Sequence, residues 1–560
     1  MSDNPSQSPA DSKDPGEVNA PVHDDGGLPI DESGLPTGGD MLGHPKGLFF
    51  LFFAELWERF SFYGMRALLV LYLVNDLFEQ LADKKDVAYE VYAAYGSLVY
   101  FTPAIGGMLA DRVIGHKNSI MLGAILMTLG HFFMAFQSEW IFYLSLGLLI
   151  IGNGFFKPNI SSMVGGLYRE GDPRRDGGFT IFYLGINLGA FLAPLVCGFL
   201  GETFGWHYGF SAAGIGMFAG LIVFWIGRRM GIYGAQGEQP AEAASRMLGP
   251  VNVKWLVYAG AFLSVPIFAG LVQFSELSVF FNVGLLQFLL LALLAIVVLY
   301  IGYTCLQVDN VTRDRLLVIA VLTFFITVFW SFFEQAGSSL TLFAEEQVNL
   351  VGLTASQTNA INPFYIVVLA IPFSIMWSRL GERNPRTIVK FGLGILQLGL
   401  GFFIFAMSAR FMDDTGRVSM FFLLAGYFTI TSGELFLSPI GLSKVTELSP
   451  ARLVSFMMGV WFLSSAFAHY IAGVIAKLTT GGGHGGEAIA DEAVAEEPGL
   501  LGGLADMITG GLPSGPVDES VVNLFAYTTV FAQIAIISFV FGIIAIAISP
   551  LINYMMHKIH

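Results

Sequence analysis

The sequence predicts an all-α polytopic membrane protein, and two observations support this prediction. Of the 560 residues, 54% are apolar and 13% are charged, which leaves too few charges to cover a soluble globule of this length. From Gly47 onward, apolar stretches of about twenty residues recur with short polar breaks between them, which is the pattern of serial transmembrane helices.

The apolar stretches predict fourteen transmembrane helices. They cover residues 47–74, 88–110, 118–137, 140–168, 177–201, 208–227, 253–274, 278–304, 315–345, 356–380, 387–409, 418–446, 452–476 and 521–548. Basic residues orient these helices, because cytoplasmic breaks carry an excess of Arg and Lys. One set of alternate breaks is rich in them, whereas the other set carries only Lys84, Lys85, Arg410, Arg417 and Lys477. We therefore expect a multi-pass protein of the cytoplasmic (inner) membrane with both termini in the cytoplasm.

The net charge of −15 resides mainly in two segments outside the predicted helices. Residues 1–45 hold nine acidic residues and one Lys, and residues 477–520 hold eight acidic residues and one Lys. The rest of the chain has equal numbers of acidic and basic residues, so the membrane body is neutral. We expect a disordered N-terminal tail without a signal peptide and a long flexible outer loop, in which the apolar run Leu500–Ile508 is a candidate surface helix.

Four charged residues lie in the middle of the first predicted span. Glu55, Glu58 with Arg59, Tyr63 and Arg66 follow one another at steps of three or four residues, which places them along one face of a helix. Each charge at mid-membrane costs about 2.5 to 3.5 kcal/mol on insertion scales, so this face is expected to contact a cavity or charged partners rather than lipid. A purely structural ion network is the alternative.

Three more ionisable residues lie within otherwise apolar spans. Lys157 stands beside Pro158 in the fourth span, and Glu334 and Glu434 stand in the ninth and twelfth spans. Buried groups of this kind change protonation when a charge pair forms or breaks, so each is a candidate for a proton-linked switch. A snorkelling Lys and structural carboxylates are the alternatives.

Several neutral polar residues also lie within the spans. Taken singly, they are more typical of packing or helix–helix hydrogen bonds than of ligand binding, and they are Tyr100, Tyr183, Asn187, Asn362 and Trp461. His131 and His469 are interpreted as satisfied core histidines, because neither stands beside a recognisable acid in the sequence, and a proton relay is the alternative.

One polar break resembles a known loop. The run from Gly107 to Lys117, which contains Asp111, Arg112 and His116, resembles the loop between the second and third helices of the major facilitator superfamily. The resemblance implies two six-helix bundles, at 46–230 and 311–548, with a linker at 231–310 that inserts two transmembrane helices, and a cytoplasmic tail at 549–560. An ordinary basic loop is the alternative.

Several motifs, in order, resemble the proton-dependent oligopeptide transporter (POT/PTR) family, bacterial branch. They are Glu55 to Arg66, Gly152 to Ser161, Phe182 to Asn187, Phe329 to Gly337 and Gly433 to Ser438. The resemblance implies proton-coupling roles for Glu55, Glu58, Arg59, Lys157 and Glu334. It implies substrate-binding roles for Tyr63, Arg66, Tyr100, Lys157, Tyr183, Asn187, Trp330, Glu334, Asn362, Glu434, Ser438 and Trp461.

The same resemblance implies how these charges work. Arg66 and Lys157 would face the carboxylate of a peptide, and Glu434 would face its amino group. Arg66 with Glu334 would form an outer gate, and Lys157 with Glu434 an inner one. The sequence departs from the family at Phe62, where Tyr is usual, and at Ala93, near which animal members carry a coupling His.

The leading hypothesis is a proton-coupled symporter that imports di- and tripeptides by alternating access, with small peptides, protons and the lipid bilayer as its partners. A lone anion such as nitrate, or a peptide-like metabolite, is the alternative substrate for the same fold. A channel and a membrane enzyme are further alternatives, although neither HExxH nor G-x-S-x-G is present. We expect no enzyme activity, and no nucleic acid, cofactor or required protein partner. The chain has no P-loop, so no nucleotide-binding site is expected. Its two cysteines, Cys197 and Cys305, lack the spacing of metal ligands, so no metal site is expected either.

Overall fold

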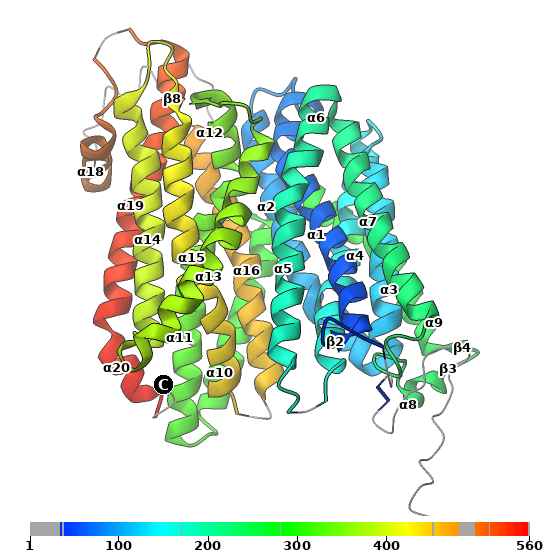
Figure 1. Cartoon of the computed structure of the whole chain (residues 1–560). Helices are drawn as coiled ribbons and strands as arrows, with labels where there is room; N and C mark the ends of the chain where they lie inside the picture. Colours follow the sequence, from blue (N-terminus) through cyan, green and yellow to red (C-terminus); the bar gives the residue numbers. More distant parts are fainter. Residues whose placement is uncertain are drawn as a thin grey trace, which may run out of the picture.

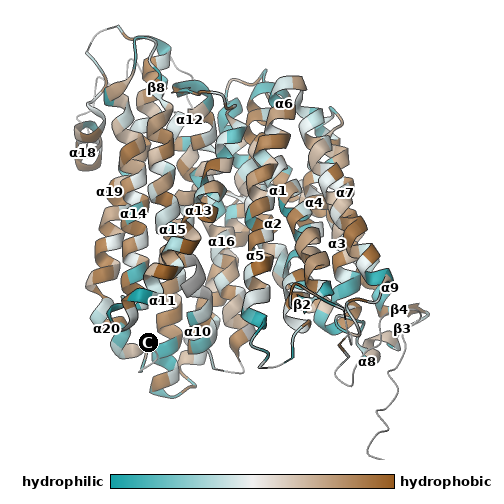
Figure 2. Ribbon diagram, viewed as in Figure 1, coloured by the Kyte–Doolittle hydropathy of each residue, from teal (hydrophilic) through white to brown (hydrophobic). Residues whose placement is uncertain are grey.

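The computed structural model describes residues 34–35, 39–169, 171–280, 282–450, 453–480, 499–514 and 516–557. Long helices run side by side across one slab, and α8, the short strand β2 (His44–Pro45) and the C-terminal end of the chain share one end of it (Figure 1). We call this end the α8 end and the opposite one, which carries α6 and α12, the α12 end. Figure 2 shows hydrophobic residues along the lengths of the helices, as a membrane-spanning slab requires.

The first half of the chain contributes six long helices. They are α1 (Lys46–Tyr72), α2 (Lys84–Leu109), α3 (His116–Met134), α4 (Glu139–Gly166), α5 (Arg175–Ala193) and α7 (Trp206–Arg229), with the short α6 (Phe199–Phe204) before the last. Helical turns extend three of them at η1 (Leu73–Leu77), η2 (Ala110–Ile114) and η3 (Pro194–Gly198). Helix α1 packs on α5 and α7, and α4 packs on α3 and α2.

The middle of the chain holds two further long helices and the short α8 (Ala241–Ala244). Helix α9 (Val253–Gln273) packs on α4 and α2 of the first half. Helix α10 (Leu285–Cys305) packs on α11 and α16 of the second half. The antiparallel strands β5 (Ser278–Phe280) and β6 (Val283–Gly284) join α9 to α10.

The second half contributes six more long helices. They are α11 (Asn310–Phe333), α13 (Ile361–Leu380), α14 (Thr387–Met407), α15 (Met420–Leu448), α16 (Val454–Lys477) and α19 (Glu519–Ala547), accompanied by the shorter α12 (Ser339–Gln347), α18 (Leu500–Thr509) and α20 (Ser549–Met555). Single helical turns stand at η4 (Glu334–Gly337), η5 (Ser356–Ala360), η6 (Gly381–Arg383), η7 (Ser408–Phe411) and η9 (Leu478–Thr480). The remaining strands form two-residue ladders, β1 (Asp40–Met41) with β2, β3 (Met247–Leu248) with β4 (Val251–Asn252), and β7 (Val348–Asn349) with β8 (Val418–Ser419).

Each of the fourteen predicted spans contains one of these long helices. Among the described residues, eleven segments are long and apolar enough to cross a membrane. Helices α1 to α3 are outside that group; α1 carries Glu55, Glu58, Arg59 and Arg66 in its middle. The count of fourteen membrane crossings and the domain boundaries therefore stay predictions. The tail at 1–45 and the loop at 477–520 lie largely outside the described residues, although α18 forms where a short helix was expected.

Two predicted spans have different boundaries in the structure. The span at 278–304 is helical only from Leu285, because residues on either side of the β5–β6 turn are extended. The span at 315–345 is broken into α11 and α12, since η4 separates them and Ser338 leaves the helical region at φ −128° and ψ −100°. This break places Glu334 at the end of a helix rather than within one.

The loop from Gly107 to Lys117 lies at the α8 end and binds the segment that follows α7. Gly115 adopts a φ of 76°, which favours glycine, and ends the turn η2. Nε2 of His116 lies 3.4 Å from Oδ1 of the Asp111 carboxylate. Lys117 donates to Glu238 and to the carbonyl oxygen of Gly234, both at 2.6 Å, and thereby anchors the chain that follows α7.

Replacing Gly106 by Ala is expected to destabilise the protein by about 1–3 kcal/mol, as overpacking does. A Cβ at Gly106 would collide with the backbone carbonyl of Gly154 where α2 crosses α4. Gly107→Ala is the matched control, because its Cβ would meet the Pro158 side chain at an ordinary 3.5 Å. Thermal unfolding in detergent checks this, and equal melting temperatures for both variants would contradict it.

Candidate functional site

A cavity of about 250 Å³ lies between the two halves of the chain. Helices α1, α2 and α5 form one side of it, and α11, η4, η5, α13 and α15 form the other. Nine of the twelve predicted substrate-binding residues line it, namely Tyr63, Arg66, Tyr100, Tyr183, Asn187, Trp330, Glu334, Asn362 and Glu434. The structure thus gathers these nine residues from seven helical elements at one place.

A charge pair between the two halves forms one wall of the cavity. Arg66 of α1 donates through Nη2 to the Glu334 carboxylate of η4. Its Nε donates to the Tyr92 hydroxyl oxygen of α2 at 2.6 Å, and the guanidinium lies 5.7 Å from the centre of that ring. The guanidinium therefore has a fixed direction, with its remaining N–H groups available at the cavity.

A second carboxylate stands on α15. Glu434 accepts a hydrogen bond of 3.0 Å from the Asn362 amide, which also donates to Thr431 at 3.0 Å. In the described part of the chain no Lys or Arg forms an ion pair with Glu434, and its side chain is buried. A buried carboxylate with one amide donor retains free acceptor sites, which suits a cationic ligand.

Aromatic side chains line the cavity between Arg66 and Glu434. Tyr63, Tyr100, Tyr183 and Trp330 line the cavity, and Tyr183 is 46% exposed. The Asn187 amide donates to the Tyr183 carbonyl oxygen at 2.9 Å, one turn earlier on α5. Rings of this kind offer contact area that tolerates different ligand side chains.

The lower half of the α1 charge stripe is buried beside the cavity rather than on its surface. Arg59 binds both carboxylate oxygens of Glu58, with Nη2 to Oε1 at 2.6 Å, and its Nε lies 3.3 Å from Glu55. Asn153 of α4 donates to Glu58 at 3.4 Å. All three charged residues are at most 3% exposed, so they form the partnered ion cluster that burial requires.

Three of the predicted substrate-binding residues are not among those lining the cavity. The Lys157 ammonium lies 4.2 Å from the centre of the Tyr100 ring, which it covers as a cation–π partner. Across the described residues it forms no ion pair with Glu434, so the expected inner gate is not formed here. Trp461 packs its ring against Gly441 of α15, and the side chain of Ser438 lies outside the described residues.

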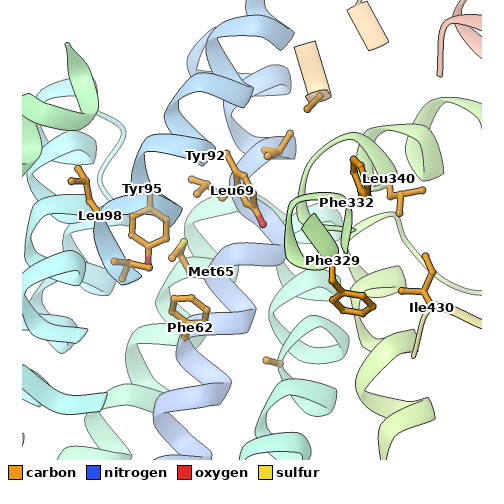
Figure 3. Packing of buried hydrophobic residues seen from close by; sticks show 14 of the residues in the cluster. Phe62, Met65, Leu69, Tyr92, Tyr95, Leu98, Phe329, Phe332, Leu340 and Ile430 are labelled. Atoms are coloured by element: carbon orange, nitrogen blue, oxygen red, sulfur yellow. The ribbon is translucent and has the colours of Figure 1, made fainter. Parts of the chain in front are cut away.

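Phe62 does not remove a hydroxyl from this cavity. Figure 3 shows its ring beside Met65 among the buried core residues, where it is 4% exposed. The Arg59 guanidinium lies 5.1 Å from the centre of the ring. Phe in place of Tyr at position 62 therefore affects the packing of the buried core beside Arg59, not the lining of the cavity.

The interpretation as a satisfied core histidine was wrong for His131, whereas His469 is buried and bonded through Nδ1 to the Ser465 carbonyl oxygen. Both ring nitrogens of His131 lack a hydrogen-bond partner within the described structure, although the residue is fully buried. His469 lies beside an acid after all, with Nε2 3.4 Å from Oε2 of Glu334. Because the two residues stand on different helices, the sequence neighbourhood of His469 did not reveal that contact.

Sequence reasoning also missed Tyr92, Asn359 and Tyr427. Tyr92 binds Arg66, and the other two line the cavity. A signal existed for Tyr92, since Tyr92, Gly96 and Tyr100 follow at four-residue steps on one face of α2. Asn359 stands on the single turn η5, where no periodicity marks it.

Polar contacts between the halves gather toward the α12 end. Lys85 of α2 pairs with Glu346 at 2.8 Å, and Glu90 pairs with Lys477. At the same end, Asn75 donates to Glu345 at 2.7 Å, Thr480 donates to Asp86 at 2.6 Å, and the Ser356 backbone donates to Glu202 at 2.8 Å. These contacts join the two halves of the chain at the α12 end.

Comparisons with known proteins agree on one family. The sequence profile of the POT family (PTR2) matches residues 117–488. The chain is 39% identical to the uncharacterized transporter YclF of Bacillus subtilis (strain 168) over 444 residues, which are 78% of this chain and 88% of that protein. It is 36% identical to a di-/tripeptide transporter of Lactococcus lactis subsp. lactis (strain IL1403) over 454 residues, which are 78% and 90% of the two chains.

Solved structures give the same result. A crystal structure of the peptide transporter POT in complex with sulfate superposes with a TM-score of 0.75 at 33% identity, covering 94% of this chain and 98% of that one. A POT family transporter in complex with a thioalcohol conjugated peptide superposes with a TM-score of 0.73 at 28% identity, covering 93% and 99%. These matches confirm the fold class, and the chain belongs to the POT family of membrane transporters, which are not enzymes.

Proposed function

We propose that this protein is a proton-coupled symporter that imports di- and tripeptides by alternating access. The observation that carries the proposal is the pair of opposite charges fixed across one cavity, Arg66 on α1 and Glu434 on α15. A peptide has a carboxylate at one end and an ammonium group at the other, whatever its side chains are. Charges of opposite sign on opposed walls, with aromatic rings between them, recognise that common part.

The proposed roles follow the positions of the residues. Arg66 binds the peptide carboxylate and Glu434 binds the ammonium group, while Tyr63, Tyr100, Tyr183, Asn187, Trp330 and Asn362 line the space between them. Glu334 exchanges Arg66 for a proton, and Lys157 is the cation that approaches the carboxylate side in another state. Glu55, Glu58 and Arg59 link protonation to the packing of α1 against α4.

We propose that the inter-half contacts close the cavity at the α12 end and that this end lies on the outside. Basic residues are sparse in the breaks at the α12 end, so the positive-inside rule places that end out of the cytoplasm and both termini in it. The state described here then faces the cytoplasm, in a bacterial inner membrane. The proton gradient supplies the energy, and we propose that no cofactor or protein partner is required.

Uptake of labelled dialanine into proteoliposomes tests this function. With an inward proton gradient, we expect accumulation above the outside concentration, and a protonophore should abolish it. Equilibration without accumulation would indicate a channel. Uptake of nitrate without dialanine would indicate the alternative substrate, for which the Glu434 carboxylate has no use.

A further inference from the structure

His469 of α16 stands next to the charge pair of Arg66 and Glu334. Its Nε2 lies 3.4 Å from Oε2 of Glu334, and this is the same oxygen that Arg66 binds. The side chain is 4% exposed, as deep in the molecule as Glu334 itself. One carboxylate oxygen thus faces a permanent cation and a titratable base.

The chain provides a built place for this imidazole. Gly96 of α2 has no side chain, and a Cβ there would collide with the His469 ring. The Tyr100 ring covers the imidazole with centroids 4.8 Å apart and planes at 31°. The ring therefore cannot turn away from Glu334 without displacing α2.

The second ring nitrogen fixes the tautomer. Nδ1 of His469 lies 2.8 Å from the Ser465 carbonyl oxygen, one turn earlier on α16. A carbonyl oxygen only accepts hydrogen bonds, so Nδ1 carries the hydrogen. In a neutral imidazole Nε2 is then a bare lone pair, and it would face a carboxylate oxygen that also only accepts. That arrangement is repulsive unless a proton lies between the two atoms.

We propose that His469 and Glu334 form a shared proton-binding site, in which one proton is held between Nε2 and Oε2. When Arg66 leaves Glu334, the proton rests on Oε2 as a carboxylic acid. When Arg66 returns, the O–H bond breaks, the N–H bond at Nε2 forms, and Arg66 takes up the freed carboxylate. This inference rests on the proposed function and adds a second proton acceptor to its gate.

The surrounding charges agree with one shared proton. The groups that face His469 are Glu334 from η4, Arg66 from α1, Lys157 from α4 and the Tyr100 ring from α2. Within the described residues, Glu334 is the one acid at ion-pair distance from the imidazole. With two cations nearby, a proton added at His469 stays only while the carboxylate is ionised, which couples the two protonation states.

Nitrogen-15 NMR of histidine-labelled protein in nanodiscs tests the site directly. His469 is assigned in the native protein by its distance to a carbon-13-labelled Glu carboxyl. We expect a hydrogen on Nδ1 at every pH and a proton at Nε2 that is lost on raising the pH, and Glu334→Gln should remove the imidazolium signal. A neutral ring with its hydrogen on Nε2, unchanged between about pH 5 and 8, would overturn the proposal.

Transport supplies the second measurement. His469→Gln should move the pH of half-maximal dialanine uptake by about one unit to lower pH, because the variant lacks one of the two atoms between which the proposed proton is held. His131→Gln is the matched control, since it removes a buried imidazole of α3 that contacts no charged partner in the described structure. A His469→Gln profile that superposes on the native one would refute the shared site. Failure of native proton-driven uptake would refute the proposed function, whereas the NMR result would still decide on His469.

Discussion

Replacing Glu434 by Gln is expected to lower dialanine uptake by about two orders of magnitude. The carboxylate is buried, accepts one hydrogen bond from Asn362, and has no basic partner in the described structure. Removing one member of a buried charge pair costs about 2–5 kcal/mol, and here the peptide ammonium is the other member. Gln has nearly the same shape as Glu and can still accept the hydrogen bond from Asn362, so a loss of uptake reports on the negative charge of residue 434. Initial uptake rates across peptide concentrations measure it.

Two controls separate this effect from misfolding. Glu447→Gln makes the same change on the same helix at an exposed position, and it should transport normally. An N-acetylated dipeptide lacks the ammonium group, so Glu434→Gln should affect its uptake little. Unchanged transport of unmodified dialanine by Glu434→Gln would show that the carboxylate does not bind the amine.

Replacing Glu58 by Gln is expected to abolish accumulation while peptide exchange continues. One proton moving down about 100 mV supplies about 2.3 kcal/mol, enough for about 50-fold accumulation in the native protein. The variant cannot change charge at position 58, so it should only equilibrate peptide. Exchange between two peptide-loaded compartments needs no net proton movement. Uptake and counterflow in the same proteoliposomes distinguish the two activities.

The stability of the Glu58→Gln variant must be measured as well, because the substitution also breaks a buried ion pair. Glu58 binds Arg59 through both oxygens in a fully buried place, and breaking a buried pair costs about 3–5 kcal/mol. Glu139→Gln, at the exposed start of α4, is a matched change outside the cluster. Loss of both accumulation and exchange, with a lowered melting temperature, would indicate a structural carboxylate.

The fold class and the charged residues of the cavity were predictable from the sequence because the membrane makes charged residues conspicuous. Glu334 and Glu434 stand out in apolar spans, and only a cavity or a partner makes such positions tolerable. Helical spacing placed Tyr63 and Arg66 on one face, and both line the cavity. Hydrophobicity and helical spacing thus marked these residues, whereas the resemblance to the POT family supplied the binding roles expected of Tyr100, Tyr183, Asn187, Trp330 and Asn362.

The remaining features depend on which helices meet, and spacing within one helix does not contain that information. His469 meets Glu334 because α16 packs beside α2 and η4, which only tertiary structure shows. Trp461, two turns earlier on α16, faces Gly441 instead of the cavity for the same reason. The separation of Lys157 from Glu434 belongs to the state of the protein, since two halves in another relative position would carry different pairs.

The insertion between the halves has a mechanical consequence. Because α9 is seated on α4 and α10 on α11 and α16, any rocking of one half against the other carries these two helices in opposite directions. The β5–β6 hairpin, which joins the two helices, must then change conformation as they move apart. A disulfide tying α9 to α10 would consequently halt turnover without touching a single residue of the peptide pocket.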